Sequence, residues 1–256
     1  MLKKKLIFIL FFQDGIFHLS RNFTLQKVGD SNWLIEKFKF LSIGDFIDEL
    51  VVLDVSRDRE NIDNIKILES SLKIIMKELF VPLTIGGGIN NLETARKCFE
   101  MGADKILLNT SIICDQDFVK ECVTKFGSQA IVGSIDVRKK AESYETFIKN
   151  GTELYGSLTN HLKLIEDLKL GEVLINNIDR DGTGVGFDLS LYSLIPEMSI
   201  PIIISGGAGK PEHFSEALLL DGVSAVGTGN LFNFIGTGFE NARNHLSSKL
   251  TSVRKI

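Results

Sequence analysis

The chain has 256 residues, of which 44% are hydrophobic, so it can bury a sizeable core and has the usual length of one α/β barrel domain. A formal net charge of −4 offers no electrostatic basis for binding nucleic acid or an anionic membrane surface. Cys98, Cys114 and Cys122 lack the spacing of a disulfide framework or a zinc site, so we expect a reducing, cytoplasmic compartment and neither metal nor cofactor.

The N-terminus begins with a basic and then apolar pattern. Lys3, Lys4 and Lys5 precede the apolar run Leu6–Phe12, which imitates a signal peptide. The run is short, ends at the turn signal Gln13-Asp14-Gly15, and is followed by no small-residue cleavage site. We therefore favour a buried first strand, and no other stretch approaches the ~18 to 20 apolar residues that cross a bilayer.

Short apolar runs then alternate with longer segments of helical period, the pattern of βα units around a parallel sheet. The predicted strands are Leu6–Phe12, Leu50–Asp54, Leu83–Ile85, Lys105–Asn109, Ala130–Asp136, Glu172–Asn176, Pro201–Ser205 and Ala225–Gly227. The predicted helices include Leu92–Met101, Asp117–Phe126, His161–Leu168, Glu212–Leu220 and Gly238–Lys249. Eight units predict a closed (β/α)8 TIM barrel, as one domain over residues 1–256.

Two connections are unusually long: Gln13 to Asn32 after the first strand, and Arg138 to Gly156 after the fifth. In the second, Asn150-Gly151 lies between Tyr144–Lys149 and Thr152–Leu154, which predicts a tight hairpin. Long loops at the carboxyl ends of barrel strands are typical of active-site loops.

An internal repeat relates the two parts of the chain. Val81–Ile89 is echoed by Ile200–Gly209, and Gly87 precedes Asn109 by 22 residues as Gly207 precedes Asn230 by 23. We therefore predict two duplicated half-barrels, at about residues 1–124 and 125–256.

The repeated glycines end strands, where a ligand can approach the backbone because no Cβ blocks it. The loops after strands 7 and 8 of a barrel commonly bind phosphate. Either pair alone is also compatible with plain turn chemistry, but two copies at matched spacing predict a ligand with two phosphates. The candidate phosphate-binding residues are Gly87, Gly88, Asn109, Thr110, Gly206, Gly207, Gly229 and Asn230.

Polar residues also stand at the ends of strands. Asp54 ends the second strand, Asp136 the fifth and Asn176 the sixth, while Asp181 follows the sixth. Carboxylates at this rim can act as general acid and base, so Asp136 and Asp181 are catalytic candidates and Asp54 and Asn176 substrate-binding ones. Helix capping is the alternative for an isolated Asp.

At the opposite rim, charged residues precede apolar strands: Lys5, Glu49, Lys105 and Glu172. They predict either a ring of ion pairs or a solvated face, and the sequence does not choose. Four scattered histidines, His18, His161, His213 and His245, lack metal-ligand spacing and are expected on the surface or in loops.

Several motifs together resemble the cyclase subunit of imidazole glycerol phosphate synthase, from about residue 5 to about residue 245. They are VPLTIGGGI at Val81–Ile89, GADKILLNTS at Gly102–Ser111, FGSQA at Phe126–Ala130, IDRDGT at Ile178–Thr183 with Gly186–Leu189 downstream, and ISGGAGKPEHF at Ile204–Phe214. The combination of IDRDGT with a downstream SGGAG is the most specific of these.

The resemblance implies a lyase subunit of histidine biosynthesis that forms a heterodimer with a glutaminase of the class I glutamine amidotransferase type. Ammonia from the glutaminase crosses the barrel and attacks a bisphosphorylated ribotide, giving imidazole glycerol phosphate and aminoimidazole-carboxamide ribotide. The resemblance also implies that Lys5, Glu49, Lys105 and Glu172 form the ammonia gate, with Lys5 where the family usually has Arg.

One departure concerns the first strand, where the resemblance places a catalytic Asp at the position of Phe11. A phenyl ring cannot exchange a proton, so cyclase activity should be poor even if binding and ammonia conduction persist. Leu19 likewise stands at the position of the family's loop lysine. Two interpretations remain open: a cyclase subunit of histidine biosynthesis, or a paralogous ammonia-conducting subunit for amidino-sugar synthesis in surface polysaccharide assembly.

Overall fold

The structure is a computed structural model that describes residues 3–38, 40–59, 61–77, 79–229 and 237–255. In chain order its elements are β1 (Lys5–Gln13), β2 (Ile16–Arg21), β3 (Thr24–Gly29), α1 (Ser31–Phe38), η1 (Phe40–Asp45), β4 (Glu49–Asp54), α2 (Ile62–Met76), β5 (Leu83–Gly86), α3 (Leu92–Glu100), β6 (Lys105–Leu108), α4 (Thr110–Cys114), α5 (Gln116–Phe126), η2 (Ser128–Ala130), β7 (Ile131–Lys140), β8 (Ser143–Ile148), β9 (Glu153–Ser157), α6 (Leu158–Asp167), β10 (Glu172–Asn177), α7 (Leu189–Tyr192), β11 (Ile202–Ser205), α8 (Pro211–Leu218), β12 (Val223–Thr228) and α9 (Gly238–Lys249).

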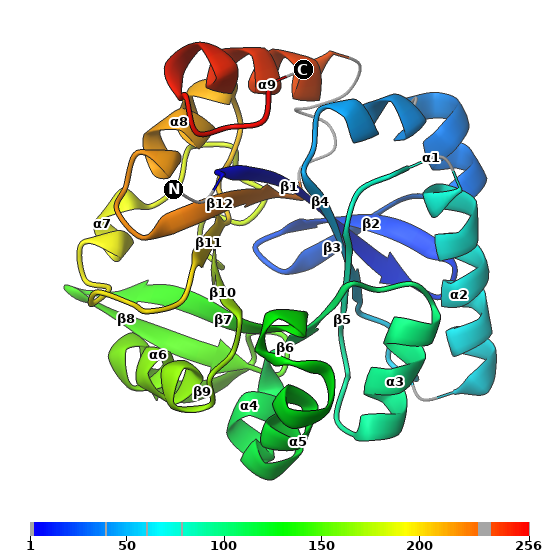
Figure 1. Ribbon diagram of the computed structural model, residues 1–256, viewed down its shortest axis with the longest axis horizontal. Helices are drawn as coiled ribbons and strands as arrows, with labels where there is room; N and C mark the ends of the chain where they lie inside the picture. The colour runs from blue at the N-terminus through cyan, green and yellow to red at the C-terminus, as the bar shows by residue number, and fades with distance from the viewer. Residues whose placement is uncertain (1–2, 39, 60, 78, 230–236, 256) are drawn as a thin grey trace.

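Parallel strands close into a barrel. Their order is β10-β11-β12-β1-β4-β5-β6-β7, and β7 pairs in turn with β10, so the described residues form a ring of eight strands without an open edge. Helices surround this ring (Figure 1). The predicted (β/α)8 barrel is confirmed, and each predicted strand corresponds to one barrel strand. The duplication of the two halves stays a prediction.

The buried strands read as continuous apolar runs because both of their faces are covered. One cluster packs the outer face of the sheet against the helices. A second cluster fills the barrel interior, with Ile7, Ile9, Val51, Leu107, Val132, Leu174, Ile203 and Ala225 at its centre and Phe11 and Leu53 packed against it. The barrel interior is therefore apolar between its two ends.

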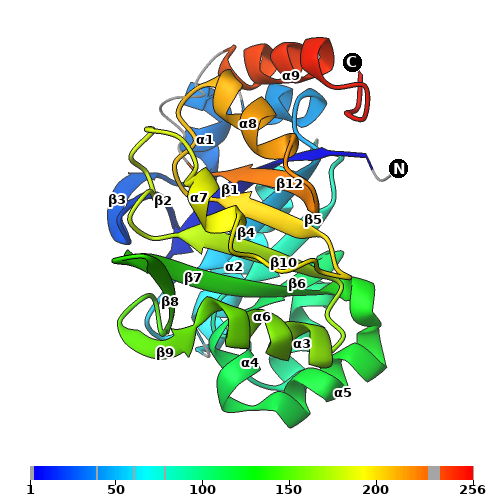
Figure 2. The same ribbon diagram turned by 90° about the vertical axis from the view of Figure 1, so that its left-hand side faces the viewer.

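Both long connections form antiparallel extensions at one end of the barrel, opposite the N-terminus (Figure 2). The predicted hairpin after the fifth barrel strand is confirmed as β8 and β9, with positive φ at Asn150 and Gly151. The connection after β1 forms a second hairpin, β2 and β3, which the sequence pattern did not predict. The turns of the two hairpins meet, since a Cβ on Gly151 would lie 2.8 Å from the ring of Phe23.

The expectation that all four histidines lie on the surface or in loops is wrong for two of them. His161 is completely buried on α6, where its ring packs against Tyr155 with centroids 5.0 Å apart, and His213 is buried on α8. Both occupy the inward face of a helix, which the amphipathic pattern of these segments favours over any polar preference of the side chain.

Candidate functional site

A cavity of about 590 Å³ opens among the carboxyl ends of the barrel strands. Its lining includes many of the predicted site residues: Phe11, Asp54, Gly87, Gly88, Asn109, Thr110, Asp136 and Asn176. A much smaller cavity, of about 20 Å³, adjoins Asp181, Gly206, Gly207 and Gly229. Phe11 lines both cavities, while the predicted residue Asn230 lies outside the described residues.

The glycine turns are required by the packing of the protein itself. Gly87 has φ of 104°, and a Cβ there would lie 1.9 Å from the carbonyl oxygen of Asp54. Gly207 has φ of 116°, and its Cβ would lie 2.2 Å from the carbonyl oxygen of Gly186. Turn chemistry therefore accounts for these glycines without a ligand, and phosphate binding at the two turns stays a prediction.

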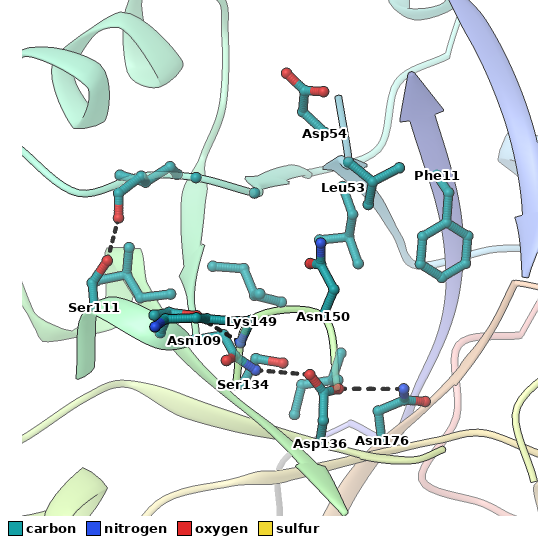
Figure 3. A pocket seen from close by; sticks show the side chains of 18 of the residues that line it. Phe11, Leu53, Asp54, Asn109, Ser111, Ser134, Asp136, Lys149, Asn150 and Asn176 are labelled. Atoms are coloured by element: carbon teal, nitrogen blue, oxygen red, sulfur yellow. Dashed lines mark hydrogen bonds between the residues drawn. The ribbon is translucent and has the colours of Figure 1, made fainter. Parts of the chain in front are cut away.

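Asp136 is held in place by two amide side chains at the wall of the larger cavity (Figure 3). Asn109 Nδ2 donates to Oδ2 over 3.0 Å, and Asn176 Nδ2 donates to Oδ1 over 3.4 Å. Burial raises the pKa of Asp136 to about 7, although the hydrogen bonds from Asn176 and Asn109 oppose the shift. A carboxyl group with this pKa can take up or release a proton at neutral pH.

Phe11 brings an apolar surface to the same cavity. In Figure 3 its ring and Leu53 lie on the side of the cavity away from Asp136. Both belong to the apolar cluster of the barrel interior, and a Cβ on Gly229 would lie 3.1 Å from the ring of Phe11. The surface that Phe11 and Leu53 present to Asp136 is therefore apolar. Paired proton transfer needs a second acid or base, and neither of these two side chains supplies one.

Asp181 is buried beside the smaller cavity and does not line the larger one. Its Oδ2 accepts hydrogen bonds from the Ser20 hydroxyl and from the Phe23 amide over 3.2 Å. Asn22 donates its amide to the Asp181 carbonyl and its side chain to two further carbonyls of the same loop. Burial raises the pKa of Asp181. The described contacts make Asp181 an anchor for the β2–β3 hairpin, and its catalytic role stays a prediction.

Asp54 ends β4 and closes the larger cavity on the side of the first glycine turn. The Ser56 amide donates to its Oδ1 over 2.9 Å, and burial raises the pKa of its carboxyl group. The site also contains residues that the sequence pattern did not single out, namely Arg59, Ser134, Lys149 and Asn150. For the last two a signal existed, because the predicted hairpin turn falls at the end of the barrel that holds the site.

At the other end of the barrel the four predicted charges form a closed ring of ion pairs. Lys5 Nζ lies 3.2 Å from Glu49 and 2.8 Å from Glu172, and Lys105 Nζ lies 2.9 Å from Glu49 and 2.8 Å from Glu172. Thr84 donates a further hydrogen bond to Glu49 over 2.7 Å. Of the two arrangements that the sequence allowed, the ion-pair ring is the one observed.

The ring perturbs the titration of its members. Burial alone would lower the pKa of Lys5, but the Glu49 and Glu172 carboxylates raise it above its usual value. Burial alone would raise the pKa of Glu49, but Lys5 and Lys105 hold it below its usual range. Lys5 and Glu49 are therefore expected to stay charged at neutral pH.

The described residues contain no group of three or more His, Cys, Asp or Glu side chains arranged to hold a metal ion. Among the same residues, no helix is both long and apolar enough to span a membrane.

Residues 28–236 match the histidine biosynthesis protein family. The chain is 41% identical over 245 residues to the "Putative imidazole glycerol phosphate synthase subunit hisF2" of Parasynechococcus marenigrum, covering 95% of this chain and 90% of that protein. It is 34% identical over 257 residues to the imidazole glycerol phosphate synthase subunit HisF of Pelodictyon phaeoclathratiforme, covering 99% of this chain and 100% of that protein. The corresponding subunit of Chloroherpeton thalassium gives the same identity and coverage.

Proposed function

The chain belongs to the histidine biosynthesis protein family, among subunits like those of imidazole glycerol phosphate synthase, and we propose that it is the ammonia-receiving barrel of a glutamine amidotransferase complex. In this proposal a glutaminase docks at the ion-pair ring, as one half of a cytoplasmic heterodimer. A phosphorylated small molecule binds in the cavity at the other end.

The observation that carries the proposal is the pairing of the ring with the cavity at opposite ends of one apolar barrel interior. Neutral ammonia crosses apolar surroundings at a far lower cost than an ion, because only the ion must be stripped of strong hydration. The ring of Lys5, Glu49, Lys105 and Glu172 then serves as the gate at the entrance. Asp104, beside Lys105, belongs to the proposed docking surface.

The substrate that the family suggests is the bisphosphorylated ribotide, with one phosphate at each glycine turn. Asp136 would exchange a proton with it, and the reaction would be the lyase and cyclase reaction that yields imidazole glycerol phosphate. Phe11 lacks the proton-transfer group expected on β1, so we propose binding and ammonia delivery with weak cyclase chemistry.

Phe11 also favours a second candidate function: an ammonia-conducting subunit for amidino-sugar synthesis in surface polysaccharide assembly. In that case the barrel delivers ammonia to a separate enzyme and needs no complete acid and base pair of its own. The apolar wall that Phe11 and Leu53 form opposite Asp136 is the observation behind this alternative.

Reconstitution tests the proposal. The purified chain is mixed with the class I glutaminase encoded in the same genome, and glutamate release from glutamine is measured with and without the chain. We expect the chain to stimulate hydrolysis at stoichiometric concentration. No stimulation and no complex in sedimentation would contradict the proposal. Ribotide turnover with free ammonium then separates the two candidates, since only a cyclase subunit consumes the ribotide.

A further inference from the structure

Arg59, in the loop after β4, is a cation in the wall of the larger cavity that the proposed chemistry does not use. Its side chain is partly buried and lies over the first glycine turn. A Cβ on Gly88 would lie 2.8 Å from Cδ and 3.0 Å from Nε of Arg59. The guanidinium and the glycine turn therefore border the same part of the cavity.

The guanidinium retains unused hydrogen-bonding capacity. A guanidinium carries five N–H donors. Nη1 donates to the carbonyl oxygen of Asp54 over 3.1 Å, and this is the one protein acceptor that Arg59 has among the described residues. Its charge also acts on the Asp54 carboxyl group, whose pKa it helps to lower, although burial raises that pKa more strongly. The Asp54 carboxylate is instead oriented by the Ser56 amide. The hydrogen bond to the Asp54 carbonyl therefore fixes the position of Arg59, and its remaining N–H donors are available to a ligand.

The other cation that lines this cavity differs in its setting. Lys149 Nζ is paired with Glu153 over 2.6 Å, and both side chains are more than half exposed. Lys149 therefore already has an anionic partner and is well solvated. This difference makes Arg59 the cation best placed to meet an anion at the first glycine turn.

Among the described residues, no Lys or Arg at the second glycine turn lines a cavity. Arg180 lies beside it, with Cβ 3.2 Å from the Cβ position of Gly207, but lines neither cavity. Its charge acts on Asp188, whose pKa it helps to lower. Both turns contain glycines with positive φ, but among the described residues only the first has a cation that lines a cavity.

We propose that Arg59 binds the phosphate of a phosphomonoester at the first glycine turn, so that the rest of the ligand extends across the cavity toward Asp136. A planar guanidinium donates two parallel hydrogen bonds to a phosphate, which gives orientation as well as affinity. Gly87 and Gly88 both have positive φ, and the turn that they form brings its backbone to the cavity wall beside Arg59. This inference rests on the proposed function, because that phosphate is one end of the proposed substrate.

Ligand titration of the full chain tests it. The probe is D-ribulose 5-phosphate, followed by calorimetry, with D-ribulose as the ligand that lacks the phosphate. We expect Arg59→Ala to weaken binding of the phosphate ester by about tenfold or more, in line with the loss of one charge-assisted bidentate contact. Arg59→Lys should recover part of the loss, because it restores charge without the planar fork.

The matched control is Arg57→Ala, which removes an exposed arginine of the same loop that does not line the cavity. It should leave the affinity within twofold. Arg59→Gln, which keeps the length of the side chain, replaces Arg59→Ala if the latter lowers the unfolding temperature. Equal affinities for Arg59→Ala and Arg57→Ala would overturn the inference, and so would equal affinities of the wild type for the ester and for D-ribulose.

Failure of this inference is separable from failure of the proposed function. The glutaminase reconstitution uses the wild-type chain without a phosphate ester, so its outcome does not depend on Arg59. Stimulation without an Arg59 effect on the ester would remove only the assignment of Arg59. An Arg59 effect on the ester without stimulation would support Arg59 and remove the ammonia-receiving role.

Discussion

Charged side chains have different kinds of partner at the two ends of the barrel. At the strand starts, four charged side chains satisfy one another in a closed ring. At the strand ends, the partners of Asp136 among the described residues are two neutral amides, and its carboxyl group faces the ring of Phe11 across an open cavity. A network that is complete without a ligand contributes to the fold itself. A buried carboxyl group without a countercharge costs stability and has its use in binding or proton transfer.

The ring should therefore tolerate the loss of a charge less well than any surface ion pair. Glu49→Gln leaves Lys5 and Lys105 to share Glu172, and Glu49 is only 2% exposed. Removing one partner of a buried ionic network is strongly destabilising, so we expect a loss of about 3 kcal/mol in the free energy of urea unfolding. The matched control is Glu93→Gln, which breaks an exposed pair with Lys97 on α3 and should leave the transition midpoint within error. Equal effects of the two variants would contradict the role given to the ring.

At the strand ends, removing the charge of Asp136 should instead raise the free energy of unfolding. Burial raises the pKa of Asp136 to about 7 in the folded chain, whereas an unfolded Asp titrates near its ordinary value. The folded state then binds more protons between about pH 4 and pH 7, so this residue's contribution to stability is complete below pH 4 and is lost as the pH rises through 7.

Asp136→Asn removes that dependence. We expect the variant to gain about 2 kcal/mol over the wild type at pH 8 and little at pH 4, as measured by urea unfolding at both values. The new Asn keeps one acceptor oxygen for Asn109 or Asn176, and the other of these two amides must turn its oxygen toward the new NH2 group to keep its hydrogen bond. A gain that is the same at both pH values would show that repacking, and not the charge, is responsible.

Removing and exchanging charges within the ring tests whether the ring is the gate for ammonia. Lys105→Ala and Glu172→Ala should each lower ammonia transfer from the glutaminase by roughly tenfold, equivalent to about 1.4 kcal/mol, because each opens two of the ion pairs. The exchange Lys105→Glu with Glu172→Lys should restore part of the transfer. Lys120→Ala, on the exposed face of α5, is the control. Complex formation and transfer that are unchanged in both single variants would show that the ring is no gate.

The sequence predicted the barrel because strands buried on both faces are continuous apolar runs, which are visible without any tertiary information. The ring was visible as single charges placed directly before such runs. The β2–β3 hairpin was missed because polar residues interrupt its apolar ones. Its turn also uses positive φ at Asn22 and Phe23, for which the sequence contains no glycine signal. Arg59 was missed because its position over Gly88 depends on how two loops approach each other.

The interpretation of Asp181 shows a different limit. The sequence pattern places it after the sixth predicted strand, at the rim where carboxylates can act as general acid and base, which favours a catalytic interpretation. In the fold, Ser20 and Phe23 of the β2–β3 hairpin donate to it. No local pattern links residues 20 and 181, so a contact with an unpredicted hairpin could not be anticipated.

The smallest expected effect belongs to the residue that separates the two candidate functions. Phe11→Asp places a carboxyl group on the wall opposite Asp136, between apolar neighbours such as Ile9 and Leu53. If the missing acid limits the reaction, turnover of the ribotide with free ammonium at alkaline pH should rise, because free ammonium bypasses the glutaminase. Complete general acid–base catalysis contributes ~10²- to 10⁴-fold, but we expect a gain of only about three- to tenfold. The new carboxyl group would have a pKa raised by its apolar surroundings, and Leu19 is buried at the position of the loop lysine.

Phe11→Asn is the matched control, since it makes similar room without an ionisable group, and an equal gain from Asn would assign the effect to space. Wild-type turnover of about 1 s⁻¹ or more would show that Phe11 does not disable the chemistry. Asp14 or Asp181 would then be the next candidates for the missing acid, and the cyclase subunit of histidine biosynthesis would become the better of the two functions.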